Sequence, residues 1–414
     1  MEERKPGPVA VASWVSYDIA NTVFWVGVVG LAFPLWLTND QGGDDAMFGY
    51  TMSATMAVVL VVSPFCGSYS DQTGRRIPLL LATTLLCIAV TLVIDTGGTL
   101  MSLGLFALAL WSMELGTVFY NSLLTEVSTL ANRGFVAGMG VGIGYLGSFL
   151  AVGTALLVSD RWGYVAVFRI IAVLFLLFAL PIFLFLRERA ADVRPATVLE
   201  RAGEAWRQLS SNLRSLGRFP GLRTYLLSRF LFGIGISTGT GFAVIYASDT
   251  IGLTDREIQV VMVAGISVAI PCSLLWGRLV DRIGASAVLV AGLLGWVVLL
   301  LIALAIPVLS WTTNLWWAVG ILTGLSISCV FTADRPMIMS FSPPEYVGEF
   351  FGLHGMVGKL ARVIGYFMWA VISVTLGFGQ PAAVVSLLVC LVLACVLLTR
   401  LGTPAPALAA EPAE

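Results

Sequence analysis

The sequence has little charge: Asp, Glu, Lys and Arg make up 11% of its 414 residues, whereas about a quarter of an ordinary soluble domain is charged. Histidine occurs once, and the sequence has neither a His-Glu-x-x-His zinc motif nor a Walker phosphate-binding loop. The six cysteines lie in apolar stretches and are expected as buried thiols rather than disulfides. These features exclude a soluble enzyme, a secreted disulfide scaffold and a nucleic-acid-binding protein, and they predict no metal, no cofactor and no ATP-driven engine.

Long apolar stretches take the place of charge. Apolar residues form 58% of the chain, and stretches of about 20 residues, each able to cross a ~30 Å hydrocarbon layer, recur along almost its whole length. The first stretch is too long for a signal peptide and has no cleavage site. Because the backbone finds no water inside a bilayer, the stretches are expected as helices. We therefore predict an all-α polytopic membrane protein with twelve transmembrane helices, at 13–37, 47–69, 77–97, 101–126, 134–159, 162–186, 221–249, 257–277, 285–309, 312–337, 349–376 and 380–399.

The basic residues predict how these helices are oriented. Of the 23 Lys and Arg residues, 17 fall on the side of the N-terminus, and only Arg161 and Arg256 fall on the opposite side. Because basic residues accumulate in cytoplasmic loops, both termini are expected in the cytoplasm of a multi-pass protein of the bacterial inner membrane. The longest polar segment, residues 187–220, is expected on the same side, as an amphipathic surface helix or a solvated linker.

The second half of the chain repeats the first. One triplet follows the second predicted helix and recurs 210 residues later: Gly67, Asp71 and Gly74, then Gly277, Asp281 and Gly284. Another triplet recurs with an offset of 214 residues: Gly134, Gly138 and Gly144, then Gly348, Gly352 and Gly358. We predict two six-helix bundles, residues 1–186 and 221–400, a cytoplasmic linker, 187–220, and a disordered cytoplasmic tail, 401–414. A solute site is expected between the bundles near the midplane.

The first triplet belongs to a segment that resembles the loop signature of the major facilitator superfamily. Residues 67–76 read Gly-Ser-Tyr-Ser-Asp-Gln-Thr-Gly-Arg-Arg, and residues 277–284 are a weaker second copy. Three further stretches resemble the vacuole-effluxer branch, related to autophagy-linked amino-acid exporters: residues 14–24 with Phe33-Pro34, residues 120–126 with 144–147, and residues 349–359. The resemblance implies the major facilitator fold and uncoupled or ion-coupled movement of a small solute by alternating access.

By this resemblance the repeated loop is a conformational latch rather than a solute site. Its residues are Gly67, Asp71, Gly74, Arg75 and Arg76, with Gly277, Asp281 and Gly284 in the second copy. Gly67 would let the helix 47–69 approach the helix 349–376, whose N-terminus would attract the Asp71 carboxylate. The two arginines are expected to pair with Glu126 or with anionic lipid headgroups. The alternative is that they only anchor the loop on one side of the membrane.

Ionisable residues inside a membrane helix are costly, so each indicates a function. Glu114 begins a polar stripe with Thr117, Asn121 and Thr125 in the predicted helix 101–126. We expect Glu114 and Asn121 to line the solute cavity, with Glu114 a candidate proton carrier; the alternative is a structural hydrogen bond. Glu114 also stands where drug antiporters have an arginine, which argues against a proton-coupled drug pump.

Arg229 stays charged in the predicted helix 221–249 and needs a carboxylate, either from a bound solute or from Asp18 or another acid. Asn21 occupies the comparable position in the helix 13–37, beside Asp18. Trp25, one turn further on, is a candidate for the cavity wall. Asp18, Asn21, Trp25 and Arg229 are therefore predicted solute contacts.

The predicted helix 349–376 carries the densest charge. Lys359, one of only two lysines, is predicted as a solute contact or a gating residue. His354, the only histidine, is a second proton-coupling candidate because its titration range lies near neutral pH. A simple hydrogen-bonding role is the alternative for His354. Arg169, in the helix 162–186, has no assigned partner.

The sequence therefore predicts a secondary transporter that moves a small polar solute, an amino acid or another anionic or zwitterionic metabolite, in the direction of export. Protons are a candidate coupling ion, the bilayer is the surrounding partner, and a monomer is expected. One alternative is an exporter of lipid-like or drug-like amphiphiles, and another is a receptor or scaffold with a transporter fold. The Gly-x-Ser-x-Gly match at residues 235–239 lies inside a predicted helix, without the strand and turn that a hydrolase requires.

Overall fold

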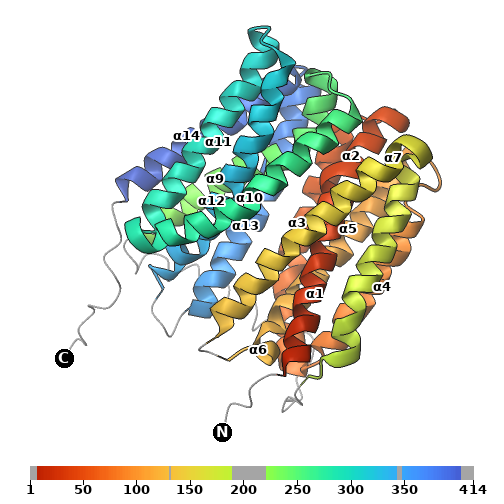
Figure 1. Ribbon diagram of the computed structural model, residues 1–414, viewed down its shortest axis with the longest axis vertical. Coiled ribbons are helices and arrows are strands. Elements are labelled where there is room, and N and C mark those ends of the chain that lie inside the picture. The colour runs from red at the N-terminus through yellow and green to blue at the C-terminus, as the bar shows by residue number, and fades with distance from the viewer. Residues whose placement is uncertain (1–6, 130–131, 189–220, 343–346, 402–414) are drawn as a thin grey trace. The chain divides into compact units, whose positions relative to one another are not determined.

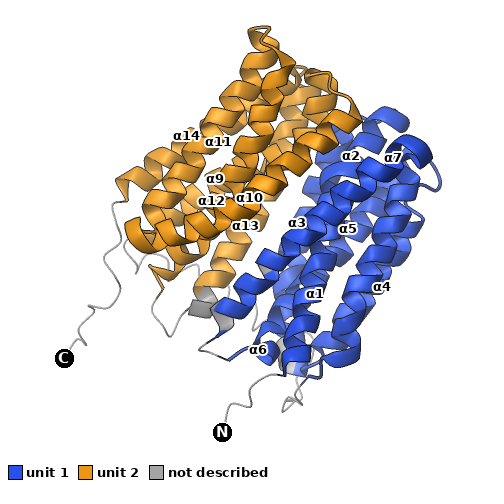
Figure 2. Ribbon diagram, in the orientation of Figure 1, with its two compact units in different colours: residues 1–206 blue, residues 207–414 orange. Residues whose placement is uncertain are grey.

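The computed structural model describes residues 7–129, 132–188, 221–342 and 347–401 (Figure 1). Within these ranges every regular element is helical, which confirms the all-α class. The chain divides into two compact units, Met1–Trp206 and Arg207–Glu414 (Figure 2). Most of the predicted linker, 189–220, and of the predicted tail, 402–414, lies outside the described residues, so the predicted boundaries between bundles, linker and tail stay predictions.

The first unit begins with a long span in which α-helical and π-helical turns alternate. Its pieces are α1 (Pro8–Phe24), η1 (Trp25–Ala32), α2 (Phe33–Leu35) and η2 (Trp36–Asp40). The other helices are α3 (Asp45–Thr73), α4 (Arg76–Leu92), α5 (Thr99–Ser122), α6 (Leu124–Val127) and α7 (Arg133–Phe185). Gly163, with φ of 73°, divides α7 into two helices, which correspond to two of the predicted spans.

The second unit has the same sequence of long helices. They are α9 (Leu222–Ile245) with η4 (Tyr246–Thr250), α10 (Asp255–Ile283), α11 (Ala285–Val308), α12 (Trp316–Met339), α13 (Val347–Ala370) with η7 (Val371–Thr375), and α14 (Gly379–Arg400). A short 3-10 helix, η5 (Thr313–Leu315), precedes α12. The π-helical turns of η2 and η4 lie 210 residues apart, so the internal repeat extends to the ends of these spans.

The helices account for all twelve predicted spans. In the described part of the chain ten helices are long and apolar enough to cross a membrane, α7 among them covers two predicted spans, and α4 is a shorter apolar helix. α4 ends at Leu92, five residues before the predicted end. The chain leaves the helical conformation at Val93, with φ of −117°. Gly97 and Gly98 follow in the turn, with φ of 86° and 82°, a left-handed conformation that glycine adopts readily.

Glycines let the helices of each unit approach closely. In the first unit α1 lies along α7, and a Cβ added at Gly147 would lie 2.6 Å from the carbonyl oxygen of Ile19. In the second unit α10 and α12 meet at Gly265 and Gly324. A Cβ at Gly265 would lie 2.7 Å from the carbonyl oxygen of Gly320, and one at Gly324 would overlap the carbonyl oxygen of Gly265. Close packing of this kind replaces the hydrophobic effect as the source of helix association in lipid.

Gly324→Ala should destabilise the protein, because its methyl group would meet backbone that can yield only if α10 and α12 separate. Overpacking of this kind costs about 1–3 kcal/mol, seen as a lower melting temperature of the detergent-solubilised protein. Gly355→Ala in α13 is the matched control, since a Cβ there meets nothing within 4 Å. Equal melting temperatures for the two variants would contradict the close contact of α10 and α12.

Candidate functional site

Four polar side chains meet inside the second unit, and we call them the Asp334 cluster: Tyr225, Arg229, Asp334 and His354. Tyr225 and Arg229 lie one turn apart on α9, on one face of that helix. α12 contributes Asp334 and α13 contributes His354. The Tyr225 hydroxyl donates a 2.7 Å hydrogen bond to Oδ1 of Asp334, and Arg229 Nε lies 2.9 Å from Oδ2.

Oδ2 of Asp334 is shared between two partners. His354 Nε2 also lies 2.9 Å from it, and Arg229 Nε lies within hydrogen-bonding distance of His354 Nε2, at 3.0 Å. A ring nitrogen that carries a hydrogen donates to the carboxylate, whereas a ring nitrogen without one accepts from the guanidinium. Whether Nε2 of His354 carries a hydrogen, which depends on the tautomer, therefore decides whether the Nε–H of Arg229 bonds to the imidazole or to Asp334.

The Asp334 cluster is largely removed from water. Asp334 is 5% exposed and Tyr225 is fully buried, while the side chains of Arg229 and His354 are 17% and 13% exposed. The guanidinium carbon of Arg229 lies 5.0 Å from the ring centre of Phe232. Removing one partner of such a buried pair leaves an uncompensated charge, at a cost of about 3–5 kcal/mol. The charged members of the cluster therefore depend on one another.

Two members of the Asp334 cluster were predicted site residues, Arg229 and His354, whereas sequence reasoning missed Asp334. Arg229 was expected to pair with a solute carboxylate, with Asp18 or with another acid of the chain. In the structure it pairs with Asp334, another acid of the chain, whereas Asp18 belongs to the first unit. A signal was available, because Asp334 lies inside the predicted helix 312–337. Lys359 lies half-buried on α13.

In the first unit, α1 holds two of the predicted solute contacts, Asp18 and Asn21, and Trp25 follows directly after it. Asp18 faces α7, where a Cβ added at Gly144 would lie 2.8 Å from its Oδ2. Asn21 is 8% exposed, and its Oδ1 is a buried atom without a hydrogen-bond partner. Trp25 is half-buried and begins the π-helical η1. This face of α1 is polar and contains an acceptor whose hydrogen-bonding capacity is unused.

The predicted polar stripe of α5 is only partly present. Glu114 is 5% exposed, inside the unit, but Asn121 is exposed at the end of α5. Thr125 lies beyond α5, in α6, because the helix is interrupted after Ser122. The hydroxyl of Thr117 donates to the carbonyl oxygen of Met113, and that of Thr125 to Ser122. The stripe therefore does not extend past Asn121 as a continuous helical face.

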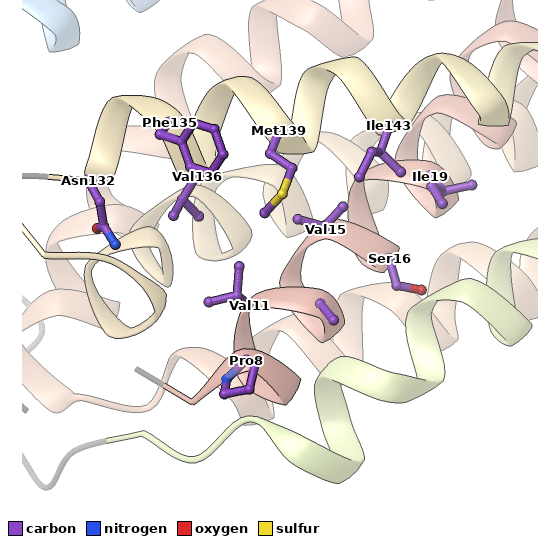
Figure 3. Close-up of a pocket in the computed structure, with 11 residues that line it drawn as sticks. Pro8, Val11, Val15, Ser16, Ile19, Asn132, Phe135, Val136, Met139 and Ile143 are labelled. Carbon is purple, nitrogen blue, oxygen red and sulfur yellow. The ribbon is translucent and has the colours of Figure 1, made fainter. Parts of the chain in front are cut away.

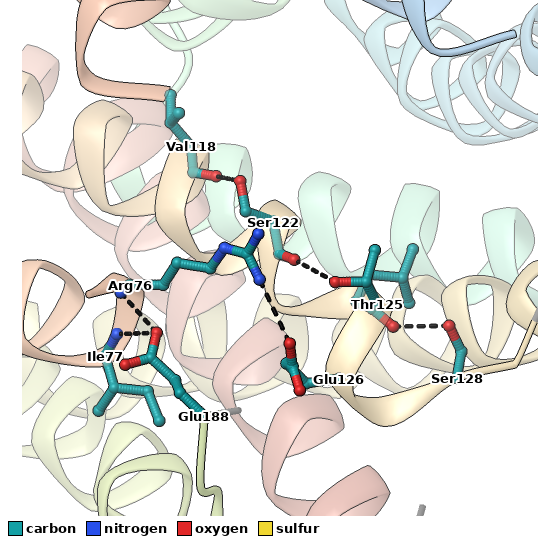
Figure 4. A network of polar contacts seen from close by, with 9 residues as sticks. Arg76, Ile77, Val118, Ser122, Thr125, Glu126, Ser128 and Glu188 are labelled. Carbon is teal, nitrogen blue, oxygen red and sulfur yellow. Dashed lines mark hydrogen bonds and ion pairs between the residues drawn. The ribbon is translucent and has the colours of Figure 1, made fainter. Parts of the chain in front are cut away.

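One latch residue, Arg76, belongs to a polar network at the start of α4 that also contains Glu126 and Glu188 (Figure 4). Gly74 ends α3 in the left-handed conformation, with φ of 61°. Arg76 pairs with Glu126 over 3.4 Å, which is one of the two expected partners, whereas Arg75 is exposed. The carboxylate of Glu188 accepts hydrogen bonds from the backbone N–H groups of Arg76 and Ile77, the first two residues of α4. It therefore caps α4 from beyond the end of α7.

The roles of the remaining latch positions stay predictions. A Cβ at Gly67 would lie 3.5 Å from Val118 of α5, an ordinary contact, so Gly67 makes no close approach within its own unit. Its expected partner, the helix 349–376, belongs to the second unit. The side chain of Asp71 lies outside the described residues, Asp281 is exposed, and Gly277 and Gly284 flank it near the end of α10.

Arg169, which had no predicted partner, pairs with Asp95 over 3.2 Å in the turn after α4. Its side chain is 58% exposed, and an exposed ion pair of this kind contributes roughly 0–1 kcal/mol. Arg169 is therefore a structural contact between α7 and the turn.

Among the side chains that the structure describes, no group of three or more His, Cys, Asp or Glu could hold a metal ion.

A groove of about 610 Å³ runs between α1 and the beginning of α7 (Figure 3). Its wall is almost entirely apolar, with Ser16 and Asn132 as the polar exceptions. Among the lining residues, Phe135 is 75% exposed. A volume in the range of ~300–1,000 Å³ suits a small molecule, and this lining suits an apolar or amphiphilic one.

Sequence comparisons find relatives that are transporters. The family described as "Vacuole effluxer Atg22 like" matches residues 125–404. The "Uncharacterized MFS-type transporter YxiO" of Bacillus subtilis (strain 168) is 23% identical over 408 residues, 93% of each chain. The "Multidrug resistance protein MdtG" of Dickeya zeae is 27% identical over 347 residues, 80% of this chain and 78% of that protein.

Structural comparisons find the same fold in solved transporters. The "peptide transporter POT in complex with sulfate" superposes with a TM-score of 0.71 at 15% identity, and 96% of each chain is covered. A "Bacterial Homolog to Human Lysosomal Transporter, Spinster" in an inward-facing conformation gives 0.67 at 16% identity, with 95% of each chain covered. At these identities the likeness concerns the fold.

Glu188→Ala should destabilise the first unit, because two N–H groups at the start of α4 lose their acceptor. The cost of losing such a cap is roughly 0.5–2 kcal/mol, and the partial exposure of Glu188 favours the lower end. Burial raises the pKa of Glu188 above 4.5, against the opposing effect of the bonds from Ile77 and Arg76. Its contribution to stability therefore falls as the pH rises through that raised pKa.

Glu188→Gln keeps the hydrogen-bond acceptor and removes the charge. At neutral pH its stability should therefore equal or exceed that of the wild-type protein, and this stability should no longer depend on the titration of residue 188. Thermal unfolding between about pH 4.5 and 7.5 measures both variants. A Gln variant as unstable as the Ala variant would mean that the negative charge, rather than the hydrogen-bond acceptor, supports α4.

Proposed function

Because the chain belongs to the vacuole effluxer Atg22-like family of MFS-type transporters, we propose that it is a proton-coupled secondary transporter. Its solute is a small anionic or zwitterionic metabolite such as an amino acid, moved in the direction of export by alternating access. It works as a monomer in the bacterial inner membrane, with both termini in the cytoplasm, and uses no cofactor and catalyses no reaction. The observation that carries this proposal is the Asp334 cluster.

The Asp334 cluster suits proton coupling because it joins a titratable imidazole to a buried ion pair. Charges inside membrane helices are costly, and a purely structural role could be filled by apolar side chains. His354 and Arg229 approach the same oxygen of Asp334, both at 2.9 Å. A proton that arrives on Nε2 of His354 makes it a donor to Asp334 and changes the hydrogen bond of Arg229. Proton binding therefore alters the environment of a fixed positive charge.

The two units present charges of opposite sign on their first helices. α1 contributes the Asp18 carboxylate, with Asn21 and Trp25 further along it. α9 contributes Arg229, and α13 contributes Lys359. An amino acid carries both an ammonium and a carboxylate group, and each set of residues suits one of these two groups. Glu114 and Asn121 on α5 complete the proposed solute contacts, with Glu114 as the second coupling candidate.

The latch has a separate role in this proposal. It comprises Gly67, Asp71, Gly74, Arg75 and Arg76 with Gly277, Asp281 and Gly284, and it holds one state of the alternating-access cycle. Support comes from the α3–α4 turn, where Arg76 pairs with Glu126 and Glu188 caps α4. These contacts make the turn rigid, as a latch requires.

A second candidate function is export of a lipid-like or drug-like amphiphile. The apolar groove between α1 and α7 favours it (Figure 3), as does the relative named a multidrug resistance protein. Flux measurements separate the candidates. Purified protein in liposomes is supplied with amino acids or with a fluorescent amphiphilic cation, with and without a pH gradient. Movement of amino acids supports the first proposal, and movement of the amphiphile alone supports the second.

His354→Gln should uncouple transport from protons, because glutamine can still hydrogen-bond to Asp334 but does not titrate. We expect solute exchange without a pH gradient to persist, while the stimulation of net flux by the gradient is lost. Glu114→Gln is the matched control, since it neutralises the other coupling candidate. If the gradient still stimulates the His354 variant and no longer stimulates the Glu114 variant, coupling resides in the first unit and the assignment to His354 is wrong.

A further inference from the structure

The proposed transport function leaves open which chemical group of the solute the second unit binds. Resting on that function, we propose that the outer edge of the Arg229 guanidinium is a carboxylate-binding slot, walled by Gly233 of α9 and Gly358 of α13. The solute that enters this unit therefore carries a carboxylate, and Gly358 is the residue that keeps its place open.

The inner edge of Arg229 is already occupied. Nε lies between Asp334 and His354, at 2.9 Å and 3.0 Å, which fixes the plane of the guanidinium. Nη1 and Nη2 have no hydrogen-bond partner in the described part of the chain, and neither is one of its buried atoms without a partner. Solvent therefore reaches both nitrogens. They retain four N–H donors, in the fork geometry that matches a carboxylate.

Two glycines border this open edge. A Cβ added at Gly358 would lie 3.2 Å from Nη2, and one added at Gly233 would lie 3.1 Å from Nη1. Both separations are tighter than ordinary van der Waals contact, so a side chain at either position would displace the guanidinium or cover its outer edge. The slot is open because both residues lack a side chain.

Gly358 has no other evident reason to be glycine. Among the described residues, the atoms within 4 Å of its added Cβ are Nη2 and the central carbon of Arg229. Helix packing accounts for Gly233, whose Cβ would also lie 2.8 Å from that of Ala361. It does not account for Gly358, which faces only the guanidinium. In the interior of a helix, glycine costs about 1 kcal/mol relative to alanine, and an open anion slot explains why α13 carries it there.

The Asp334 cluster also explains why the slot can bind an anion. Asp334 compensates the charge of Arg229 from the Nε side, and Phe232 covers a face of the guanidinium at 5.0 Å. A buried arginine held in this way is stable without solute, yet its remaining donors are directed and only weakly hydrated. The Nη1 and Nη2 donors of Arg229 are therefore already oriented before a carboxylate binds, so binding does not have to order the arginine side chain.

The test compares acids with their amides and alanine variants with each other. The purified full chain is titrated with leucine and succinate, each beside its amide, leucinamide and succinamide. Binding is followed by the shift in melting temperature and by equilibrium dialysis of the radiolabelled compound. We expect at least one acid to bind and its amide to bind at least about tenfold more weakly, as the loss of charge-assisted hydrogen bonds requires.

Gly358→Ala should weaken binding of that acid by about tenfold or more. Gly355→Ala on the same helix, where a Cβ meets nothing within 4 Å, should leave it unchanged. Arg229→Lys keeps the charge and loses the fork, so it should resemble Gly358→Ala. Wild-type melting temperatures for the glycine variants without solute show that both fold. Three results would contradict the proposed slot. They are an unchanged affinity in Gly358→Ala, equal binding of an acid and its amide, and no binding of either acid.

Failure of the slot and failure of the proposed function are distinguishable. If liposomes that contain the protein move a solute without a carboxylate, the slot is wrong and the transport function stands. If an acid binds as described but no solute crosses the membrane, the slot stands and the transport function is wrong.

Discussion

The ion pair between Arg229 and Asp334 is the interaction on which the second unit depends. In a chain with 11% charged residues, it joins α9 to α12 inside an apolar bundle, and His354 brings α13 to the same carboxylate oxygen. Each group is acceptable there only because the others compensate it. A change in the charge or the hydrogen bonds of one member therefore alters the contacts of three helices.

Glycine serves different purposes at different positions of the two units. Gly147 in the first unit and Gly324 in the second lack a side chain because another backbone occupies that space, so they fix how closely helices pack. Gly74 ends α3 in a conformation that other residues adopt only under strain. At Gly358 the backbone has no unusual conformation, and an added Cβ would meet the guanidinium of Arg229 rather than another backbone. The space around a glycine therefore distinguishes residues that hold the scaffold from one that keeps a site open.

The helices could be predicted from the sequence, whereas the contacts between them mostly could not. Apolar length alone predicts a membrane helix, and it places the end of α4 five residues too late because Val93 already leaves the helical conformation. Arg229 and His354 were predicted as functional because ionisable residues inside a span are costly. Their shared partner Asp334 was missed, since it lies 105 residues after Arg229 in the sequence. The ion pair of Arg169 with Asp95 likewise could not be predicted from the sequence, because the two residues come together only when the unit folds.

The central claim is that a solute carboxylate binds the outer edge of Arg229 while Asp334 holds the inner edge. A cryo-electron microscopy map of the full chain in a lipid nanodisc, with saturating solute, tests it most directly. The account predicts solute density within about 3 Å of both Nη nitrogens, bordered by Gly233 and Gly358, with Nε still on Asp334. Solute density in the groove between α1 and α7, with the outer edge of Arg229 empty, would contradict it.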